Sequence, residues 1–471
     1  MQEFDFIVVG AGSAGYAAAR TARGLGKRVA FVDPGPLAGL CILRGCMPSK
    51  TLLRSAELAQ LAREAPEMGV KAKIEGFDWP RMIARKREII NGFADYRIEG
   101  LREFPIFTGP ARFVNEREIE VGGERLRGAK FLIATGSVIS RPDIPGLEEI
   151  GYLTSDEVLE LERPPKDVVV LGGGYVATEL GQFLHRMGVP ATFIQRSAHL
   201  LSLEDHDLGE ALTRYFKEEG ITVHTGTTIE RAFLRNGRKV VSFRREGRVH
   251  EAEAEEIFFA QGRCPNVMGL DLEKAGVTYS RYGITVDLYM RTSNPNIFAA
   301  GDVVGNFQLV HVAIHEGEVA ARNAFLPEQE RVDYAMVAAH AVFTDPQVAV
   351  AGYRERDLIA EGRSYLKGSF PFDDLGKAIS VGRTKGFVKM LADPDNGRIL
   401  GVGIIGPEAS DLIHEAIALL HFKATVHDVL RMPHLHPTMA EIMTYPAEEI
   451  ADAMTAGRAA QAIAGAGGAT A

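Results

Sequence analysis

Two segments of the chain share one pattern of apolar and polar positions. In each, a short apolar run is followed by closely spaced glycines, then by a stretch of helical length and a second apolar run. The first segment covers residues 4–33 and the second covers residues 167–196. Short apolar runs beside glycine turns are typical of strands buried on both faces of a parallel sheet. We therefore predict two strand–turn–helix–strand units that look like the products of a duplication.

The turns of both units have the glycine spacing of nucleotide-binding turns. The residues concerned are Gly10, Gly12, Gly15 and Asp33 in the first unit, and Gly172 and Gly174 in the second. Glycine allows a tight turn and a close approach to a pyrophosphate, and the following helix offers free N–H groups to the phosphates. Ala177 stands at the third glycine position of the second unit. A structural turn is the alternative for a single motif, but strand, turn, helix and Asp33 together favour a dinucleotide site.

Proline, glycine and a late change of pattern predict the domain organisation. Pro142, Pro145 and Gly146 end the first part, and a proline pair at 164–165 precedes the second unit. From about residue 335 the pattern changes to alternating strands (386–390, 401–405) and helices (410–423, 438–454), which indicates an α+β module. We expect the boundaries 1–146, 147–265, 266–334 and 335–455. Residues 456–471, mostly alanine and glycine, are expected to form a disordered tail.

The overall composition narrows the class of protein. The chain is 46% hydrophobic and 24% charged, with a formal net charge of −9, which argues against a general nucleic-acid binder. No apolar stretch is long enough for a membrane span, and the N-terminus lacks the order of a signal peptide. Three cysteines are too few for a disulfide framework. We expect a cytoplasmic protein in which any disulfide is redox-active.

The segment 41–50 carries the most informative chemistry. Four residues separate Cys41 from Cys46, and Gly45 and Pro48 can shape the loop so that a small disulfide closes. Two unpaired buried cysteines, or half of a zinc site, are the alternatives. Zinc needs further ligands at matched spacing, and only Cys264 remains, so we expect no metal. Beside a nucleotide-binding unit, a dithiol–disulfide couple is the better interpretation.

Two cations flank the second cysteine. Arg44 and Lys50 would both favour the thiolate of Cys46. A solvated surface charge is the alternative for Arg44. Lys50 ends the cysteine motif itself, which favours a functional position.

A second motif near the C-terminus has the residues of an acid–base pair. His436 precedes Pro437, which we expect at the first helical position, and Glu441 follows about one turn on. Glu441 is then placed to accept the other ring N–H of His436, as a general acid–base histidine requires. His434 is interpreted as structural.

These motifs resemble those of the pyridine nucleotide–disulfide oxidoreductases, a family that includes glutathione reductase, dihydrolipoyl dehydrogenase and mercuric reductase. The resemblance extends to about residue 455. Besides the two turns, it rests on Cys-x4-Cys-x-Pro-Ser-Lys, Ala134-Thr135-Gly136, Gly262-Arg-x-Pro-Asn266, Ala300-Gly-Asp302 and His436-Pro-Thr-x-x-Glu441. It implies an α/β fold with two Rossmann-like domains, for FAD and NAD(P), and a C-terminal α+β dimerisation domain.

The resemblance also assigns residues to cofactors. It implies FAD at Gly10, Gly12, Gly15, Asp33, Lys50, Thr135, Gly136 and Asp302, and NAD(P) at Gly172, Gly174, Tyr175, Glu179, Arg196 and Gly262. Lys50 and Glu179 would pair beside the flavin, and Tyr175 would gate the nicotinamide pocket. Cys46 would face the flavin and Cys41 would exchange with substrate. His436 and Glu441 would reach the cysteines from the other subunit of a homodimer.

The implied reaction passes hydride from NADPH through FAD to the Cys41–Cys46 disulfide and on to a small disulfide. Dihydrolipoyl dehydrogenase, working with NAD⁺, is the main alternative. A mercuric reductase is expected less, because the chain has no cysteine pair near its C-terminus. A redox sensor without turnover is a further alternative, but it would not need His436 and Glu441.

Several positions depart from the family pattern. Gln195 and Arg196 stand where an acid would bind the 2′-hydroxyl of NAD, and a cation there favours the 2′-phosphate of NADP. The second arginine of NADPH-dependent members is replaced by Ser202. Arg20 lies where glutathione reductases place a substrate-binding arginine, with a surface charge as the alternative. Cys264 replaces a usual arginine, without a physical explanation.

Overall fold

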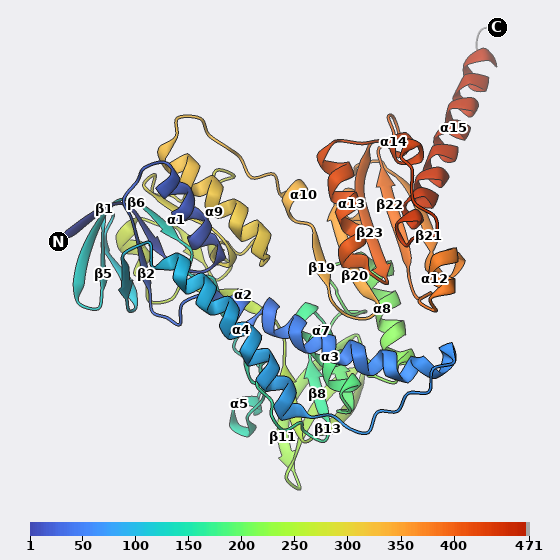
Figure 1. Cartoon of the computed structure of the whole chain (residues 1–471), viewed down its shortest axis with the longest axis horizontal. Helices are drawn as coiled ribbons and strands as arrows, with labels where there is room; N and C mark the ends of the chain where they lie inside the picture. Colours follow the sequence, from blue (N-terminus) through green and yellow to red (C-terminus); the bar gives the residue numbers. More distant parts are fainter. Residues whose placement is uncertain (468–471) are drawn as a thin grey trace.

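The structure is a computed structural model of the chain, and it describes residues 1–467. Three groups of elements are visible in Figure 1. One contains the N-terminus with α1 and α9, a second contains α7 and β8, and a third contains the sheet around β23. The mixed α/β fold class predicted from the sequence is confirmed. The exact domain boundaries remain predictions.

The first group is built on a seven-stranded sheet. Its order is β3-β2-β1-β6-β5-β4, and β18 pairs with β6. The strands are β1 (Gln2–Val9), β2 (Val29–Asp33), β3 (Ile106–Thr108), β4 (Ala111–Asn115), β5 (Glu118–Val121), β6 (Glu124–Ile133) and β18 (Ile297–Ala299). Helices α1 (Ser13–Gly24) and α9 (Val310–Phe325) pack together beside it. Residues 297–299 therefore return the chain to its first sheet.

Strand β1 is apolar without alternation because both of its faces are covered. Phe6 and Val8 pack with the alanines of α1, whereas Ile7 and Val9 pack with Phe131 on the opposite face. Fully burying one such side chain contributes about 1.5–3 kcal/mol. The carboxyl end of β1 is thereby fixed where the glycine turn begins.

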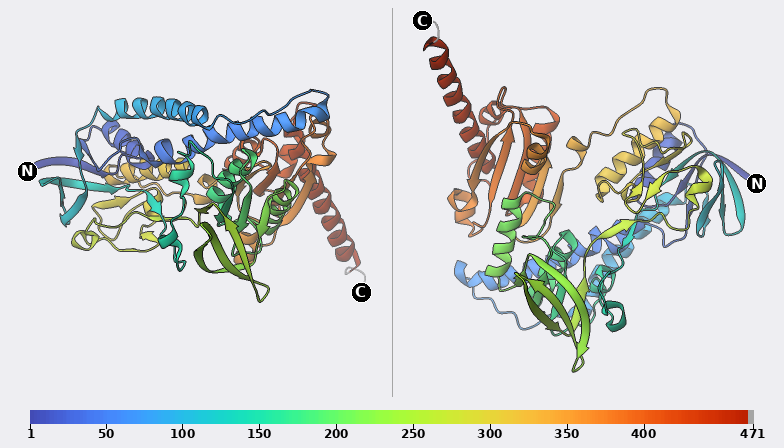
Figure 2. Two further views of the ribbon diagram at one scale, coloured as in Figure 1. Left: turned by 90° about the horizontal axis from the view of Figure 1, so that it is seen from below. Right: turned by 180° about the vertical axis from the view of Figure 1, so that it is seen from behind.

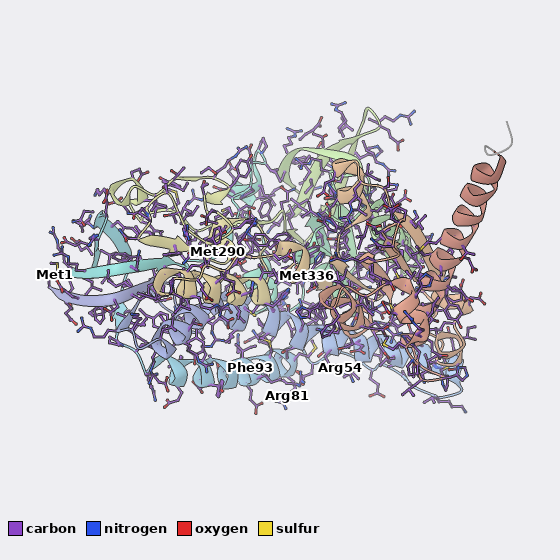
Figure 3. All side chains as sticks on the ribbon, turned by 90° about the horizontal axis from the view of Figure 1, so that it is seen from above. Met1, Arg54, Arg81, Phe93, Met290 and Met336 are labelled. Atoms are coloured by element: carbon purple, nitrogen blue, oxygen red, sulfur yellow. The ribbon has the colours of Figure 1, made fainter. Side chains whose placement is uncertain are left out.

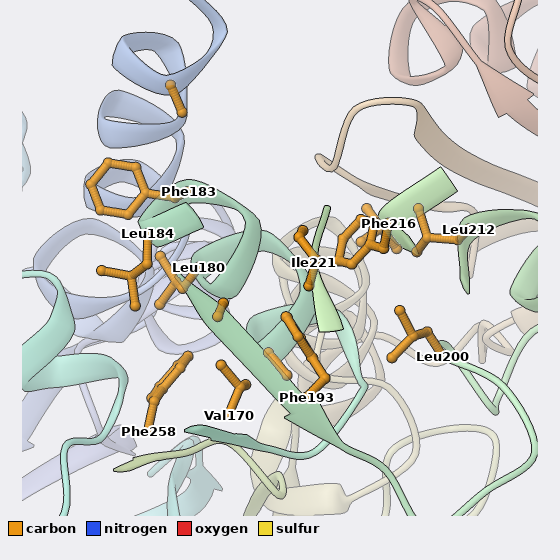
Figure 4. Close-up of a cluster of buried hydrophobic side chains, with 14 of the residues drawn as sticks. Val170, Leu180, Phe183, Leu184, Phe193, Leu200, Leu212, Phe216, Ile221 and Phe258 are labelled. Carbon is orange, nitrogen blue, oxygen red and sulfur yellow. The ribbon is translucent and has the colours of Figure 1, made fainter. Parts of the chain in front are cut away.

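The second group repeats this plan on a four-stranded sheet of order β10-β9-β8-β14. Its elements are β8 (Val168–Leu171), α7 (Tyr175–Arg186), β9 (Ala191–Ile194), α8 (His206–Glu218), β10 (Thr222–His224) and β14 (Glu256–Phe259). An antiparallel sheet of β11 (Thr227–Arg235), β12 (Arg238–Arg245) and β13 (Arg248–Ala254) covers it. Figure 4 shows its core, in which Phe183 of α7, Phe193 of β9 and Phe216 of α8 are fully buried.

The third group is a five-stranded antiparallel sheet with helices. Its order is β19-β20-β23-β22-β21. The elements are α10 (Tyr334–Val337), β19 (His340–Val342), β20 (Gln347–Gly352), α11 (Glu355–Glu361), β21 (Leu366–Pro371), α12 (Gly376–Ser380), β22 (Phe387–Ala392), β23 (Ile399–Gly406), α13 (Ala409–His421), α14 (Val426–Arg431) and α15 (Thr444–Gly467). Helix α15 packs against β21 and β22 at its start, and its C-terminal end projects away from the sheet (Figure 2).

Three helices join the groups. They are α2 (Gly39–Arg44), α3 (Cys46–Glu64) and α4 (Trp79–Leu101). Helices α3 and α4, which carry Arg54, Arg81 and Phe93, run along one side of the molecule (Figure 3). The remaining short elements are β7 (Ser137–Ile139), α5 (Leu147–Ile150), α6 (Ser155–Val158), β15 (Arg263–Pro265), β16 (Tyr279–Ser280), β17 (Gly283–Ile284) and the 3₁₀ turns Ala65–Met68, Leu272–Ala275, Asp302–Val304, Phe372–Asp374 and Ala440–Met443.

Ion pairs fix the second group against the third. Lys389 of β22, 1% exposed, lies 2.7 Å from Asp205 Oδ2 and 2.7 Å from Asp207 Oδ1. Arg186 of α7 lies 2.9 Å from Asp345 Oδ2, next to β20. A buried cation deprived of its acid is strongly destabilising, so these contacts hold the two groups in one arrangement.

The C-terminal helix differs from its prediction. The expected helix 438–454 is a 3₁₀ turn over Ala440–Met443 followed by α15, and Pro437 lies in the loop before the turn. Pro437 is therefore not at a first helical position. Helix α15 extends to Gly467, through much of the segment expected to be a disordered tail. Residues 468–471 lie outside the described residues, and that expectation remains a prediction.

Residues 1–467 contain neither a helix suited to span a membrane nor a cluster suited to bind a metal. Among residues 1–467, no helix combines the length and apolar character that crossing a bilayer requires. The same residues contain no cluster of three or more His, Cys, Asp or Glu side chains able to hold a metal ion.

Candidate functional site

One large cavity brings together most of the residues singled out in the sequence. Its volume is about 2160 Å³. The predicted site residues that line it are Gly10, Gly12, Asp33, Cys41, Cys46, Lys50, Thr135, Gly136, Gly172, Gly174, Tyr175, Glu179, Arg196, Gly262 and Asp302. Both glycine turns and both cysteines therefore open onto the same space, which exceeds the usual size of a single ligand pocket.

The first turn is shaped to receive a dinucleotide. Gly10 has a φ of +107°, and a Cβ there would collide with the backbone oxygen of Ala134. Gly15 does not line the cavity, and a Cβ on it would collide with the backbone oxygen of Gly10, so glycine is required where α1 packs under the turn. Gly12, in contrast, has no atom within 4 Å of the position of a Cβ. This open space at the start of α1 fits a pyrophosphate against the helix N-terminus.

Polar groups around the first turn are ordered by the protein itself. Asp33 Oδ2 accepts a hydrogen bond of 2.7 Å from the N–H of Ala11, which ties the end of β2 to the turn. Asp302 Oδ2 accepts a 2.6 Å hydrogen bond from the hydroxyl of Ser137, and burial raises the pKa of Asp302. Arg263 Nε donates to the same hydroxyl at 2.9 Å. The Gly262-Arg263 segment thus supports Asp302, a role for Arg263 that the motif alone did not show.

The Ala134-Thr135-Gly136 segment crosses from the first sheet to the second group. The Thr135 hydroxyl donates to the carbonyl of Asn266 at 2.7 Å, and Gly136 has a φ of +71°. The two motifs that contain these residues therefore lie side by side. They close the cavity at the end of β6.

The second turn repeats the geometry of the first. Gly172 has a φ of +121°, and a Cβ there would collide with the backbone oxygen of Ala260. Gly174 and Gly262 both face open space, with no atom within 4 Å of a Cβ. Helix α7 begins directly after Gly174, so its free N–H groups face a space that fits a second nucleotide.

The two cysteines lie on consecutive short elements. Cys41 is in α2 and Cys46 is the first residue of α3, with Gly45 between the helices. A Cβ on Gly45 would lie 3.1 Å from the Cα of Cys41, so glycine permits the close approach. Both cysteines are half-buried, and in this structure their sulfurs are not bonded to each other. A hydrogen-bonding interaction between the two side chains changes the pKa of both cysteines.

The two cysteines differ in acidity. The hydrogen bond from Cys41, together with the charge of Lys50, lowers the pKa of Cys46 to about 7, although burial opposes the change. The same hydrogen bond and burial raise the pKa of Cys41 far above its usual range. A position at a helix N-terminus also favours the Cys46 thiolate. Of the two thiols, Cys46 is therefore the one that ionises more readily.

Lys50 and Glu179 form the ion pair that the resemblance implied. Lys50 Nζ lies 2.7 Å from Glu179 Oε2, and the Glu179 side chain is buried. Glu179 Oε1 accepts a 3.0 Å hydrogen bond from the N–H of Phe343, and Lys50 Nζ lies 4.5 Å from the centre of the Phe343 ring. Phe343, from the third group, completes this part of the wall and was not singled out from the sequence.

Tyr175 has partners that the sequence did not predict. Its hydroxyl donates to Glu204 and lies 3.2 Å from His340 Nε2. Burial and the neighbouring Glu204 raise the pKa of Tyr175. No local pattern could connect these three residues, because they come from α7, a loop and β19.

Arg196 lies on the cavity rim at the end of β9. It is exposed, and within residues 1–467 it makes no ion pair. The neighbouring Ser202 also lines the cavity. Arg356 of α11 donates to the carbonyl of Ser202 at 2.9 Å, so a cation lies near this position although its side chain comes from the third group.

His436 and Glu441 lie apart from the cavity. His436 Nδ1 is 2.9 Å from Glu441 Oε1, and Glu441 Oε2 accepts a 2.8 Å hydrogen bond from the N–H of Thr438. These contacts lower the pKa of Glu441, with the Thr438 N–H as the larger cause. The side chain of His436 is 79% exposed. Its Nε2 atom is thus free to meet another molecule, whereas His434 is bound to Glu415 at 2.9 Å.

The remaining candidates have local partners. Arg44 Nη1 lies 3.2 Å from Asp156 Oδ2, which links α2 to the short helix α6. The guanidinium of Arg20 lies 5.9 Å from the centre of the Tyr16 ring. Cys264 lies opposite Val138 in the antiparallel pair of β15 and β7, and its side chain is half-buried. Nothing in the structure explains why a cysteine stands at this position.

Known proteins match this chain over most of its length. The family described as pyridine nucleotide-disulphide oxidoreductase matches residues 4–317, and the dimerisation domain of the same family matches residues 338–447. A mercuric reductase from Bacillus cereus is 35% identical over 443 residues, which cover 93% of this chain and 70% of the relative. A dihydrolipoyl dehydrogenase from Geobacillus stearothermophilus is 34% identical over 455 residues, which cover 95% of this chain and 96% of the relative.

Proposed function

Because the chain belongs to the pyridine nucleotide-disulphide oxidoreductases, we propose that it is an NADPH-dependent reductase of a small disulfide. The enzyme class, the cofactors FAD and NAD(P)H, and assembly through a dimerisation domain follow from the family. The substrate and the preference for NADPH are the proposed part.

The two glycine turns provide a cradle for each cofactor. Gly10, Gly12, Asp33 and Asp302 would hold FAD at the end of the first sheet. Gly172, Gly174 and Arg196 would hold the nicotinamide nucleotide at the end of the second. Bound FAD supplies the relay that accepts hydride from the nicotinamide and passes an electron pair to the disulfide.

One observation carries the proposal: Cys46, Lys50 and Glu179 line the same cavity as both turns. A thiol whose pKa is about 7 beside a lysine is suited to be the inner member of a redox pair. The higher pKa of Cys41 leaves it as a thiol until a base removes its proton. The inner cysteine would face the flavin, and the outer cysteine would meet the substrate.

The substrate disulfide is then reduced by two successive thiolate attacks. The Cys41 thiolate attacks one sulfur of the substrate disulfide, forming a mixed disulfide and releasing the first thiolate. The Cys46 thiolate attacks the sulfur of Cys41, so the Cys41–Cys46 bond forms and the second substrate thiolate leaves. The substrate gains two electrons, which NADPH replaces by reducing the Cys41–Cys46 disulfide in the next turnover.

His436 of the partner subunit would move the protons. The side chain is exposed on the dimerisation domain, and Glu441 holds its Nδ1 atom, so Nε2 can take the proton of Cys41 and return it to the leaving thiolate. Paired imidazole and carboxylate of this kind typically contribute a rate factor of about 10²–10⁴.

The NADPH preference is tested by replacing Arg196. An arginine contact with a phosphate contributes about 1.5–3 kcal/mol, so Arg196→Glu should lower kcat/KM for NADPH by about tenfold or more and spare NADH. Arg214→Glu, on the surface of α8, is a matched control for the change of charge. An equal loss of kcat/KM with NADPH and with NADH would mean that Arg196 does not bind the 2′-phosphate.

The main alternative is a dihydrolipoyl dehydrogenase working with NAD⁺, because relatives with that name match nearly the whole chain. Purified enzyme should be assayed with a panel of low-molecular-weight disulfides and NADPH, with dihydrolipoamide and NAD⁺, and with Hg²⁺. The proposal expects the largest kcat/KM with a disulfide and NADPH. If dihydrolipoamide oxidation or Hg²⁺ reduction has the larger kcat/KM, that activity replaces the proposed disulfide reduction.

A further inference from the structure

Tyr175 is anchored to two buried residues from distant parts of the chain. Its hydroxyl donates to Glu204 Oε1, and His340 Nε2 lies 3.0 Å from the same carboxylate oxygen. The side chain of Glu204 is 0% exposed and that of His340 is 10% exposed. Three polar side chains thus meet at one largely buried place in the cavity wall.

The ring itself is docked on the wall. It stacks on the ring of His340 with centroids 5.6 Å apart and planes at 30°. It also packs against the buried apolar cluster of the second group. Tyr175, His340 and Arg354 line the cavity, whereas Glu204 does not. The carboxylate that accepts the hydrogen bond of Tyr175 therefore comes from a residue outside the cavity lining.

The anchor is charged. Burial alone would raise the pKa of Glu204 and lower that of His340, but their mutual contact reverses both changes. Glu204 Oε2 is buried without a hydrogen-bond partner among the described residues. Arg354, whose Nη1 donates to the carbonyl of Leu203 at 2.5 Å, lies close enough to stabilise this charge. A hydrogen bond to such a carboxylate is about twice as strong as one between neutral groups.

We propose that Glu204 and His340 are positioning residues that hold Tyr175 against the wall and keep the passage between the second turn and the Lys50–Glu179 pair open to nicotinamide. Tyr175 directly follows Gly174, and its side chain has staggered alternatives about χ1. A ring that loses its anchor can turn into the cavity and obstruct it. This inference rests on the proposed place of the nicotinamide nucleotide at the second turn.

The anchor is also a link between domains. Glu204 belongs to the loop before α8, while His340 begins β19 of the third group. The ion pairs of Lys389 with Asp205 and Asp207 hold that loop against β22. Access of the nucleotide would therefore depend on how the dimerisation domain sits on the second group.

The test is a double-mutant cycle read by nucleotide binding. Binding of NADP⁺ and NAD⁺ to the FAD-loaded dimer is measured by calorimetry for the wild type, Tyr175→Phe, Glu204→Leu, Glu204→Gln and the double variant Tyr175→Phe/Glu204→Leu. Glu210→Gln, exposed on α8, is the control. FAD content and melting temperature establish that each variant is folded, and His340→Asn replaces Glu204→Leu if that variant is not.

The expected result is an increase in Kd of about tenfold for Tyr175→Phe and for Glu204→Leu, as loss of a hydrogen bond to a charged group implies. The Kd of Glu204→Gln should lie between the Kd values of these variants and of the wild type, because its amide oxygen still accepts a hydrogen bond from Tyr175. The double variant should be no worse than Tyr175→Phe alone. Unchanged Kd values, additive effects, or a lower Kd would each overturn the proposal. Tight nucleotide binding without any disulfide reduction would refute the proposed function but not this anchor.

Discussion

At the scale of single residues, the thiols of Cys41 and Cys46 differ because only one of them can donate their shared hydrogen bond. Cys46 also begins a helix and lies near Lys50, so three influences favour its thiolate. For Cys41 the hydrogen bond with Cys46 and burial raise the pKa, and they outweigh the lowering effect of Lys50. The division of labour between the two cysteines is thus set by local geometry, before any cofactor is considered.

Replacement of Cys41 by alanine should therefore raise the pKa of Cys46. An acid whose pKa is lowered to about 7 is mostly ionised above pH 7 and loses its charge as the pH falls through that value. In Cys41→Ala the midpoint should move up toward the usual range of a cysteine. This midpoint is measured from the ultraviolet absorbance of the thiolate in the reduced protein. The absorbance of Cys46→Ser is subtracted, so that only Cys46 contributes. An unchanged midpoint would mean that the hydrogen bond from Cys41 is unimportant.

At the scale of elements, the two turns show how much a sequence can predict. Continuous apolar runs predicted β1, β2, β8 and β9, because strands covered on both faces leave no alternation to misinterpret. The end of the chain was less predictable. Pro437 is typical of a helix start, but the N–H of Thr438 is bound by Glu441, and the turn begins only at Ala440.

Contacts between distant elements could not be predicted from local pattern. The Lys50–Glu179 pair followed from the family resemblance alone, since 129 positions separate the two residues. Glu204 and His340 belong to no motif, and only the packing of β19 on the second group brings them to Tyr175. A contact between a buried histidine and a buried glutamate exists only once the chain is folded, so the sequence alone does not show it.

Two glycines of the first turn should respond differently to the same substitution. Gly10→Ala forces a side chain into a positive φ, which costs about 1–3 kcal/mol, and into the oxygen of Ala134. It should lower the melting temperature even without FAD. Gly12→Ala meets only open space, so it should fold normally but lose FAD.

Melting curves of the apoproteins and the FAD content after purification distinguish the two variants. Gly24→Ala, whose Cβ also meets no atom within 4 Å, serves as a control outside the turn. Normal FAD content in Gly12→Ala would contradict the placement of a pyrophosphate at this turn.

At the scale of the whole molecule, the cysteines and His436 belong to different surfaces of one chain. The cysteines line the cavity, whereas His436 is exposed on the dimerisation domain beside Leu435, which is 79% exposed. Residues 338–447 match the dimerisation domain of the family, and His436 and Leu435 lie on the exposed surface of that domain. We therefore expect each active site to be completed by the partner.

Mixed dimers test this arrangement. Cys41→Ser and His436→Gln should each be inactive alone, but a mixed dimer contains one site with both residues intact. Random exchange of subunits should restore about a quarter of the wild-type activity. Mixing Cys41→Ser with Cys46→Ser should restore none, because every site then lacks a cysteine. Recovery in this control, or none in the first mixture, would mean that the site is not shared.

If Cys41 and Cys46 form a redox couple in series with FAD, each subunit stores electrons at two places. Anaerobic titration with NADPH, followed by absorbance, counts the electron pairs that each subunit accepts. The wild type should take up about two equivalents, one for FAD and one for the disulfide, and Cys41→Ser about one. Equal uptake by both proteins would contradict the claim.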